Sequence, residues 1–247
     1  MTDTRKKATT PGIITIGAAQ RAGTNPPCAD GFHVHRRGER VVAAVVDGAG
    51  HRPATVDLAQ HAPPTITLVG MAMGGLVGLI TAGRMAAAYD RPPHMSAIYA
   101  SMEPGLPTTL HWVGDCRAYG WSSQGLRLYS TDQTMGQWLR VNGGAAVELS
   151  AEEHDNWARL GLAQASEMTC RQVEIPEDVP VVLLVSDGVS DQVDLEDAAA
   201  LCRKFADAPQ ALADALVTAA KDEDNGGGEL YRDDATVVVL RRTPASR

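Results

Sequence analysis

The chain has 247 residues, of which 44% are hydrophobic and only 4% aromatic, so aliphatic side chains must pack a sizeable core. Its net charge of −8 argues against a nucleic-acid partner, because binding to phosphate backbones requires a basic surface. The cysteines are scattered without a CxxC pair, which argues against a structural zinc site and a disulfide framework and favours reduced thiols in a cytoplasmic protein.

The N-terminal segment is polar and lacks the apolar core of a signal peptide. We expect residues 1–11 to form a disordered tail, residues 12–241 a single domain, and residues 242–247 a second tail. A short first strand is expected at 13–17 and a loop rich in glycine, proline and asparagine at 20–29. Asp30 then begins a hairpin whose returning strand ends at Asp47. In an antiparallel pair, both acids lie at the same edge of the sheet.

Two apolar runs end in the same dipeptide. Residues 41–46 precede Asp47 and Gly48, and residues 181–186 precede Asp187 and Gly188. Each run predicts a buried strand that delivers one carboxylate to its own carboxyl end, where the chain turns sharply. One Asp-Gly pair alone is usually a turn, whereas two matching copies indicate two halves of one site.

Residues 65–83 contain no charged side chain, and Gly70, Gly74 and Gly78 form a series of small residues four apart. This pattern has two interpretations: a transmembrane helix with a dimerisation face, or a helix buried in a layered domain. We favour the buried helix, because glycines and threonines dilute the hydrophobicity. The expected helices are 53–61 and 66–89.

The remaining elements follow in order. Strands are expected at 95–101 and 108–113, then a turn at Gly114 and Asp115 that leads into another strand. Thr134 is expected to cap a helix at 135–141, and a weaker helical pattern surrounds 157–162. Helices are expected at 193–205 and 209–221, and Asp233 enters a last strand.

Five acids are expected at strand ends beside turns, namely Asp30, Asp47, Asp115, Asp187 and Asp233. Asp191 and Asp234 lie close in sequence to two of these five. Carboxylates brought together repel each other unless a cation lies between them. Mg²⁺ and Mn²⁺ prefer such oxygen ligands, and a pair of ions can activate a shared water. Gly48 offers its carbonyl as a further ligand, and His51 could protonate a leaving group near neutral pH.

These motifs resemble, in their order, those of the metal-dependent PP2C-type (PPM) protein serine/threonine phosphatases, especially the short bacterial members. The resemblance covers most of the chain, roughly residues 17–240. It rests on six segments, which are Ala29-Asp30-Gly31-Phe32, Val46-Asp47-Gly48-Ala49-Gly50, Val113-Gly114-Asp115-Cys116-Arg117, Ser130-Thr131-Asp132-Gln133-Thr134, Val185-Ser186-Asp187-Gly188 with Asp191, and Asp233-Asp234-Ala235-Thr236.

The resemblance implies an α+β fold, a four-layer αββα sandwich of two antiparallel sheets flanked by helices. It implies hydrolysis of phosphoserine and phosphothreonine by a hydroxide bound to two Mn²⁺ or Mg²⁺ ions. By analogy the first two ions take Asp47 as a bridge, the Gly48 carbonyl, Asp187 and Asp233, with Asp30 acting through water. Asp115 and Asp191, with Asp187, match a third site. Catalytic roles then fall to Asp47, Asp187, Asp233 and His51.

The phosphate-holding part departs from the family pattern. Asn25 stands where the family usually has an arginine, Arg21 is the nearest arginine, and Ala29 replaces a polar residue. Losing an arginine contact removes a charge-assisted interaction with phosphate, so Arg21 is our candidate substitute. The alternative function is a catalytically weak PP2C-like regulatory or binding module. The expected partner is a phosphoprotein made by a serine/threonine kinase; we expect a cytoplasmic monomer that binds neither nucleic acid nor membrane.

Overall fold

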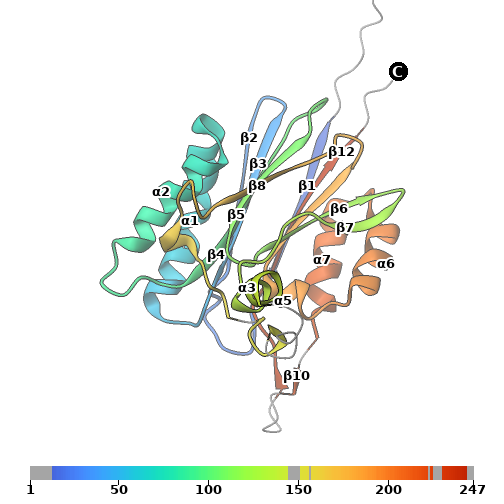
Figure 1. Ribbon diagram of the computed structural model, residues 1–247. Coiled ribbons are helices and arrows are strands. Elements are labelled where there is room, and N and C mark those ends of the chain that lie inside the picture. Colours follow the sequence, from blue (N-terminus) through green and yellow to red (C-terminus); the bar gives the residue numbers. More distant parts are fainter. Residues whose placement is uncertain (1–12, 144–150, 156, 222, 225–229, 244–247) are drawn as a thin grey trace, which may run out of the picture.

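The computed structural model describes residues 13–143, 151–155, 157–221, 223–224 and 230–243. Two antiparallel five-stranded sheets pack face to face, and helices cover their outer surfaces (Figure 1). The expected αββα sandwich is therefore confirmed. The expected tail at 1–11 lies outside the described residues, as do residues 244–247. At the other boundary, the last strand extends beyond 241 and includes the buried Arg242.

The first sheet has the strand order β2-β3-β4-β5-β8 and the second has the order β1-β12-β9-β6-β7. The strands of the first sheet are β2 (Gly31–Arg37), β3 (Arg40–Gly48), β4 (Met95–Met102), β5 (Thr108–Val113) and β8 (Arg171–Ile175). Those of the second are β1 (Ile14–Arg21), β12 (Ala235–Arg242), β9 (Val181–Val185), β6 (Arg117–Ser122) and β7 (Gly125–Leu128). A separate ribbon pairs β10 (Glu223–Asp224) with β11 (Leu230–Tyr231).

The β2–β3 hairpin has the expected geometry. Gly31 pairs with Val46, so Asp30 and Asp47 lie at the same edge of the sheet. Side chains of β3 alternate between the core that joins the two sheets and the core beneath the helices. Because both faces of the strand are covered, its sequence is continuously apolar rather than alternating.

Helices α1 (Pro53–Met73) and α2 (Gly75–Ala87) cover the first sheet. The expected break between helices near residue 62 is wrong, because α1 continues through Pro63 and Pro64 and ends at Met73, with Gly74 as its C-cap. Gly74 has φ +94°, a conformation that favours glycine, and it separates the two helices. No described helix has the length and hydropathy needed to cross a membrane.

Helices α6 (Leu195–Phe205) and α7 (Pro209–Ala219) cover the second sheet, close to the expected bounds (Figure 1). Thr134 caps α3 (Met135–Asn142) by accepting a hydrogen bond from Gln137 N at 3.2 Å. The helical pattern expected around 157–162 is wrong, because Ala158 bridges to Thr134 and only a 3₁₀ turn (Leu162–Gln164) follows. Strand β8 and the short helix α5 (Asp187–Ser190) were not expected.

Candidate active site

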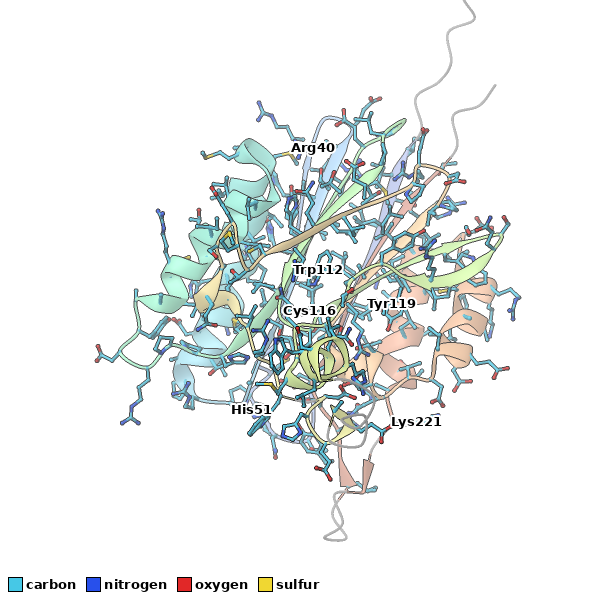
Figure 2. All side chains as sticks on the ribbon, viewed as in Figure 1. Arg40, His51, Trp112, Cys116, Tyr119 and Lys221 are labelled. Carbon is cyan, nitrogen blue, oxygen red and sulfur yellow. The ribbon has the colours of Figure 1, made fainter. Side chains whose placement is uncertain are left out.

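A cleft of about 690 Å³ opens at the end of the sandwich where β3 and β9 finish. Arg40, at the start of β3, and His51, just beyond its end, lie at opposite ends of the molecule (Figure 2). The acidic side chains on the cleft wall are Asp47, Asp115, Asp187, Asp191 and Asp233. Most of the sequence-predicted site residues therefore line one cleft, together with Gly48 and His51.

Asp47 and Asp187 join the two sheets at this cleft. Asp47 ends β3, whereas Asp187 follows β9 and opens α5, and the backbone N–H of Asp187 donates to Oδ2 of Asp47 at 3.2 Å. The glycine after Asp187 is required sterically, because a Cβ on Gly188 would overlap the carbonyl oxygen of Asp234. The Asp-Gly pattern thus combines a ligand-type carboxylate with a close approach between chain segments.

Asp30 lies behind the cleft wall and is only 6% exposed. Burial raises the pKa of Asp30 well above its ordinary value, and repulsion from the nearby carboxylate of Asp187 raises it further. Burial likewise raises the pKa of Asp47, with repulsion from Asp30, and that of Asp187, with repulsion from Asp47. The carboxylates are close enough to disfavour one another's ionisation.

Asp115 is held by Ser96, which lies opposite Asp47 in the β3–β4 pairing. The Ser96 hydroxyl donates to Oδ1 of Asp115 and accepts from its backbone N–H at 3.1 Å. No motif singled out Ser96, because its importance depends on cross-strand register rather than on local sequence. Tyr231, another unpredicted wall residue, has its pKa raised by burial and then by Asp233.

Asp191 takes part in an ion-pair network centred on Arg117. Arg117 Nη1 donates to Oδ1 of Asp191 at 2.7 Å and to the carbonyl of Ser190 at 3.2 Å. On its other side, Arg117 binds both carboxylate oxygens of Asp132, at 2.7 to 3.1 Å. The carboxylate assigned by resemblance to a third ion is thus already compensated by a cation of the chain itself.

Arg21 does not contribute to the cleft. Its guanidinium donates to the backbone carbonyls of Thr218 and Ala220, at and just beyond the end of α7, and it is absent from the cleft wall. These bonds satisfy carbonyls left free at the helix end, so the sequence-based assignment of Arg21 to substrate phosphate is not supported by its position. Asn25 does line the cleft, whereas no lysine or arginine does so among the described residues.

The donor chemistry of the cleft fits divalent cations. Its wall carries hard carboxylate oxygens and the backbone of Gly48, and Oδ2 of the buried Asp30 has no hydrogen-bond partner within the described structure. No three Asp, Glu, His or Cys side chains of that part of the chain converge on one point in the manner of a finished metal site. The fit therefore rests on ligand type, burial and mutual repulsion.

The wall also includes side chains that the sequence did not single out. Trp157 is 65% exposed at the cleft and packs edge-on against His154, with ring centroids 5.0 Å apart. His94 lines the cleft as well, and its Nε2 is buried without a hydrogen-bond partner among the described atoms. Both follow segments with no recognisable motif, so only the tertiary fold brings them here.

The fold and the acidic cleft place the chain in the class of PP2C-like αββα proteins. Residues 118–243 match the family model of stage II sporulation protein E (SpoIIE), which is more than half of the chain. The chain therefore belongs to the SpoIIE/PP2C-type (PPM) family of serine/threonine phosphatases. Members of this family generally depend on metal ions.

Solved structures show the same fold. A bacterial serine phosphatase matches with a TM-score of 0.73 at 14% identity, covering 95% of this chain and 100% of that one. The S. agalactiae serine/threonine phosphatase matches with a TM-score of 0.72 at 17% identity, covering 92% of this chain and 99% of that one. The PPM Ser-Thr phosphatase of Mycobacterium smegmatis, in complex with cacodylate, matches with a TM-score of 0.70 at 18% identity, covering 92% of this chain and 97% of that one. No curated protein matches the chain at a significant level.

Proposed function

We propose that this protein is a Mn²⁺- or Mg²⁺-dependent phosphatase that hydrolyses phosphoserine and phosphothreonine in proteins. The observation that carries the proposal is the contact between Asp187 N and Asp47 Oδ2, since it brings the two Asp-Gly carboxylates from different sheets into one cleft. Burial raises the pKa of both carboxyls, and repulsion from neighbouring carboxylates raises it further. A divalent cation bound between the carboxylates would relieve this repulsion.

The residues that would hold the ions follow from the wall. Asp47, the carbonyl of Gly48, Asp187 and Asp233 would hold two ions, with Asp30 acting through water. Asp115 and Asp191 would join Asp187 at a third position, where Asp191 already pairs with Arg117. When bound, the ions supply an activated water for in-line attack on phosphorus.

The chain's own groups would carry the remaining steps. The described wall offers no lysine or arginine to bind the phosphoryl group, so the cleft carboxylates would serve as the residues that hold the cations. His51 faces the cleft and would donate a proton to the serine or threonine oxygen as it leaves. Exposed Trp157 offers an apolar wall for the residues that flank the phosphorylated side chain.

The substrate is proposed to be a phosphoprotein, the product of a serine/threonine kinase, because family membership implies substrates of this class. The net charge of −8 and the acidic cleft disfavour a nucleic acid. We further propose that the protein acts as a cytoplasmic monomer, which agrees with its free cysteines Cys28, Cys116, Cys170 and Cys202.

The proposal is tested by hydrolysis of a phosphoserine peptide with Mn²⁺, with Mg²⁺ and with EDTA. Wild-type protein should release inorganic phosphate only with a divalent ion, and Asp47→Ala and Asp187→Ala should each lose at least about 100-fold of that rate. Asp207→Ala is the matched control, because Asp207 is an exposed acid that pairs with Arg241 away from the cleft. Full activity in either cleft variant would refute the mechanism.

A second candidate is a PP2C-like regulatory module that binds phosphoproteins with little turnover. It is favoured by one observation, namely that Arg21 is committed to backbone carbonyls and neutral Asn25 occupies the cleft wall. The distinguishing measurement is turnover of p-nitrophenyl phosphate by purified protein with and without Mn²⁺. Metal-stimulated turnover rejects this candidate, whereas phosphopeptide binding without turnover supports it.

A further inference from the structure

Asp234 is a buried carboxylate that the resemblance to the family leaves without a role. It follows Asp233 directly, is 3% exposed and does not line the cleft itself. Its Oδ1 accepts from the backbone N–H of Gly23 and its Oδ2 from that of Ala29, both at 2.6 Å. The same Oδ2 lies 3.5 Å from Nε2 of His51.

These contacts tie together three parts of the cleft. Gly23 and Ala29 bracket the loop that carries Asn25, and a Cβ on Gly23 would overlap the carbonyl oxygen of Arg232, so the loop lies directly against the entry to β12. His51 approaches from the end of β3. A carboxylate that is nearly excluded from water and fixed by two backbone N–H groups has little freedom to move, so it is a rigid anchor for an imidazole.

We propose that Asp234 is a positioning residue that orients His51 for proton transfer to the leaving group, a role that rests on the proposed phosphatase activity. Asp234 faces Nε2 of His51, which leaves Nδ1 to act toward the substrate. A fixed carboxylate next to one ring nitrogen holds the imidazole in one orientation. Asp234 itself touches neither the substrate nor the reacting atoms.

The step balances with water as the co-reactant. A bond forms between the attacking water oxygen and phosphorus while the bond from phosphorus to the serine oxygen breaks. The electron pair of the broken bond stays on the serine oxygen, which takes the proton from the His51 imidazolium. The proton lost by the attacking water restores the imidazolium, and the products are inorganic phosphate and an unmodified serine. No oxidant or reductant takes part.

The test compares two leaving groups in the Mn²⁺-loaded enzyme. A serine alkoxide needs a proton to leave, whereas p-nitrophenolate leaves readily without one. Asp234→Asn and His51→Gln should each lower kcat about 10- to 100-fold on a phosphoserine peptide and less than about 3-fold on p-nitrophenyl phosphate. The double variant should lose no more than His51→Gln alone, because both substitutions remove one function.

Controls separate positioning from damage to the fold or the metal site. Asp207→Asn should leave both rates unchanged, and Mn²⁺ affinity measured by calorimetry should be the same for Asp234→Asn and wild type. Equal losses on both substrates, or independent losses that multiply in the double variant, would overturn the positioning role. Absence of metal-stimulated turnover of either substrate by wild type would instead refute the proposed phosphatase activity.

A readout that needs no turnover tests the contact itself. In ¹⁵N-imidazole spectra, Asp234→Asn should move the ring resonances of His51, and Asp207→Asn should leave them in place. Unchanged His51 resonances in a folded Asp234→Asn protein would overturn the proposal, whether or not the protein is an active phosphatase. If Asp234→Asn does not fold, His51→Gln alone must still lower kcat more on the phosphoserine peptide than on p-nitrophenyl phosphate. Equal losses of kcat on the two substrates would overturn the proposal.

Discussion

The backbone N–H of Asp187 donates to Oδ2 of Asp47 across 3.2 Å, and this contact joins the two sheets at their acidic edge. Asp47 belongs to the hairpin sheet and Asp187 follows the central strand of the other sheet. The candidate site therefore exists only when the sandwich is closed, because neither sheet carries the whole acidic wall. Its stability and its chemistry are consequently coupled.

Removing one wall carboxylate should stabilise the metal-free protein. In EDTA, Asp187→Asn should raise the melting temperature by about 2–4 °C, which corresponds to about 1 kcal/mol for a domain of this size, because burial and repulsion from Asp47 oppose ionisation of Asp187. Calorimetric melting scans with and without Mn²⁺ measure this effect. With Mn²⁺ the order should reverse; a variant that melts below wild type in EDTA would contradict the repulsion.

Gly188 should tolerate no side chain. Gly188→Ala should lower the unfolding free energy by about 1–3 kcal/mol and reduce turnover, since its Cβ would overlap the Asp234 carbonyl and push α5 away from β12. Gly38→Asn is a matched control, because Gly38 lies in the β2–β3 turn with φ +61° and open space, a backbone conformation that asparagine accepts. Urea unfolding measures both, and equal stability of Gly188→Ala and wild type would contradict the packing.

The two acids that share Arg117 should contribute unequally to stability. Asp132 receives three bonds from Arg117, on both of its carboxylate oxygens, and is 19% exposed, whereas Asp191 receives one bond and is 42% exposed. Asp132→Asn should therefore lower the unfolding free energy by about 2 kcal/mol and Asp191→Asn by less than about 1 kcal/mol, because exposed pairs contribute little. Urea unfolding in EDTA gives both values. The reverse order would show that Arg117 is held mainly by Asp191.

His111 should make stability sensitive to mild acid. It is buried under α2, its Nε2 bonds to Gln172 at 3.0 Å, and burial lowers its pKa from the ordinary 6.5. The unfolded chain then binds the proton first, so the unfolding free energy falls as the pH drops from 6.5 through the lowered pKa. Between pH 7.5 and 5.5, His111→Gln should lose less stability than wild type in urea unfolding. An identical loss in both proteins would contradict this role.

Much of the fold could be predicted from local patterns. The β2–β3 hairpin followed from its turn and its alternation, and the buried strands of both Asp-Gly motifs followed from apolar runs. The predicted break between α1 and α2 is wrong, because consecutive prolines normally end a helix, whereas here the break comes at Gly74, whose positive φ favours glycine. Strand β8 was missed, since only its first-sheet neighbour β5 makes it a strand.

The site was predictable where its residues lie in motifs and not where they meet through tertiary contacts. Asp47 and Asp187 could be predicted because each follows an apolar strand and precedes a glycine. Ser96 reaches the site because it pairs with Asp47 across two strands. Asp234 contacts the loop that contains Ala29, which lies more than 200 residues earlier in the chain. Neither relationship leaves a local sequence pattern. Arg21 was chosen by its proximity in sequence to Asn25, but the direction of its side chain is set by α7.

A titration of the purified protein with Mn²⁺ in a calorimeter tests the central claim most directly, namely that the carboxylates of both sheets form one divalent-cation site. Wild-type protein is predicted to bind at least two ions, as the ligand set around Asp47, Asp187 and Asp233 requires. Asp47→Asn should lose the shared ligand and bind at most one ion with comparable affinity, while Asp207→Asn binds as wild type does. Failure of folded wild-type protein to bind Mn²⁺, or unchanged binding by Asp47→Asn, would contradict the account.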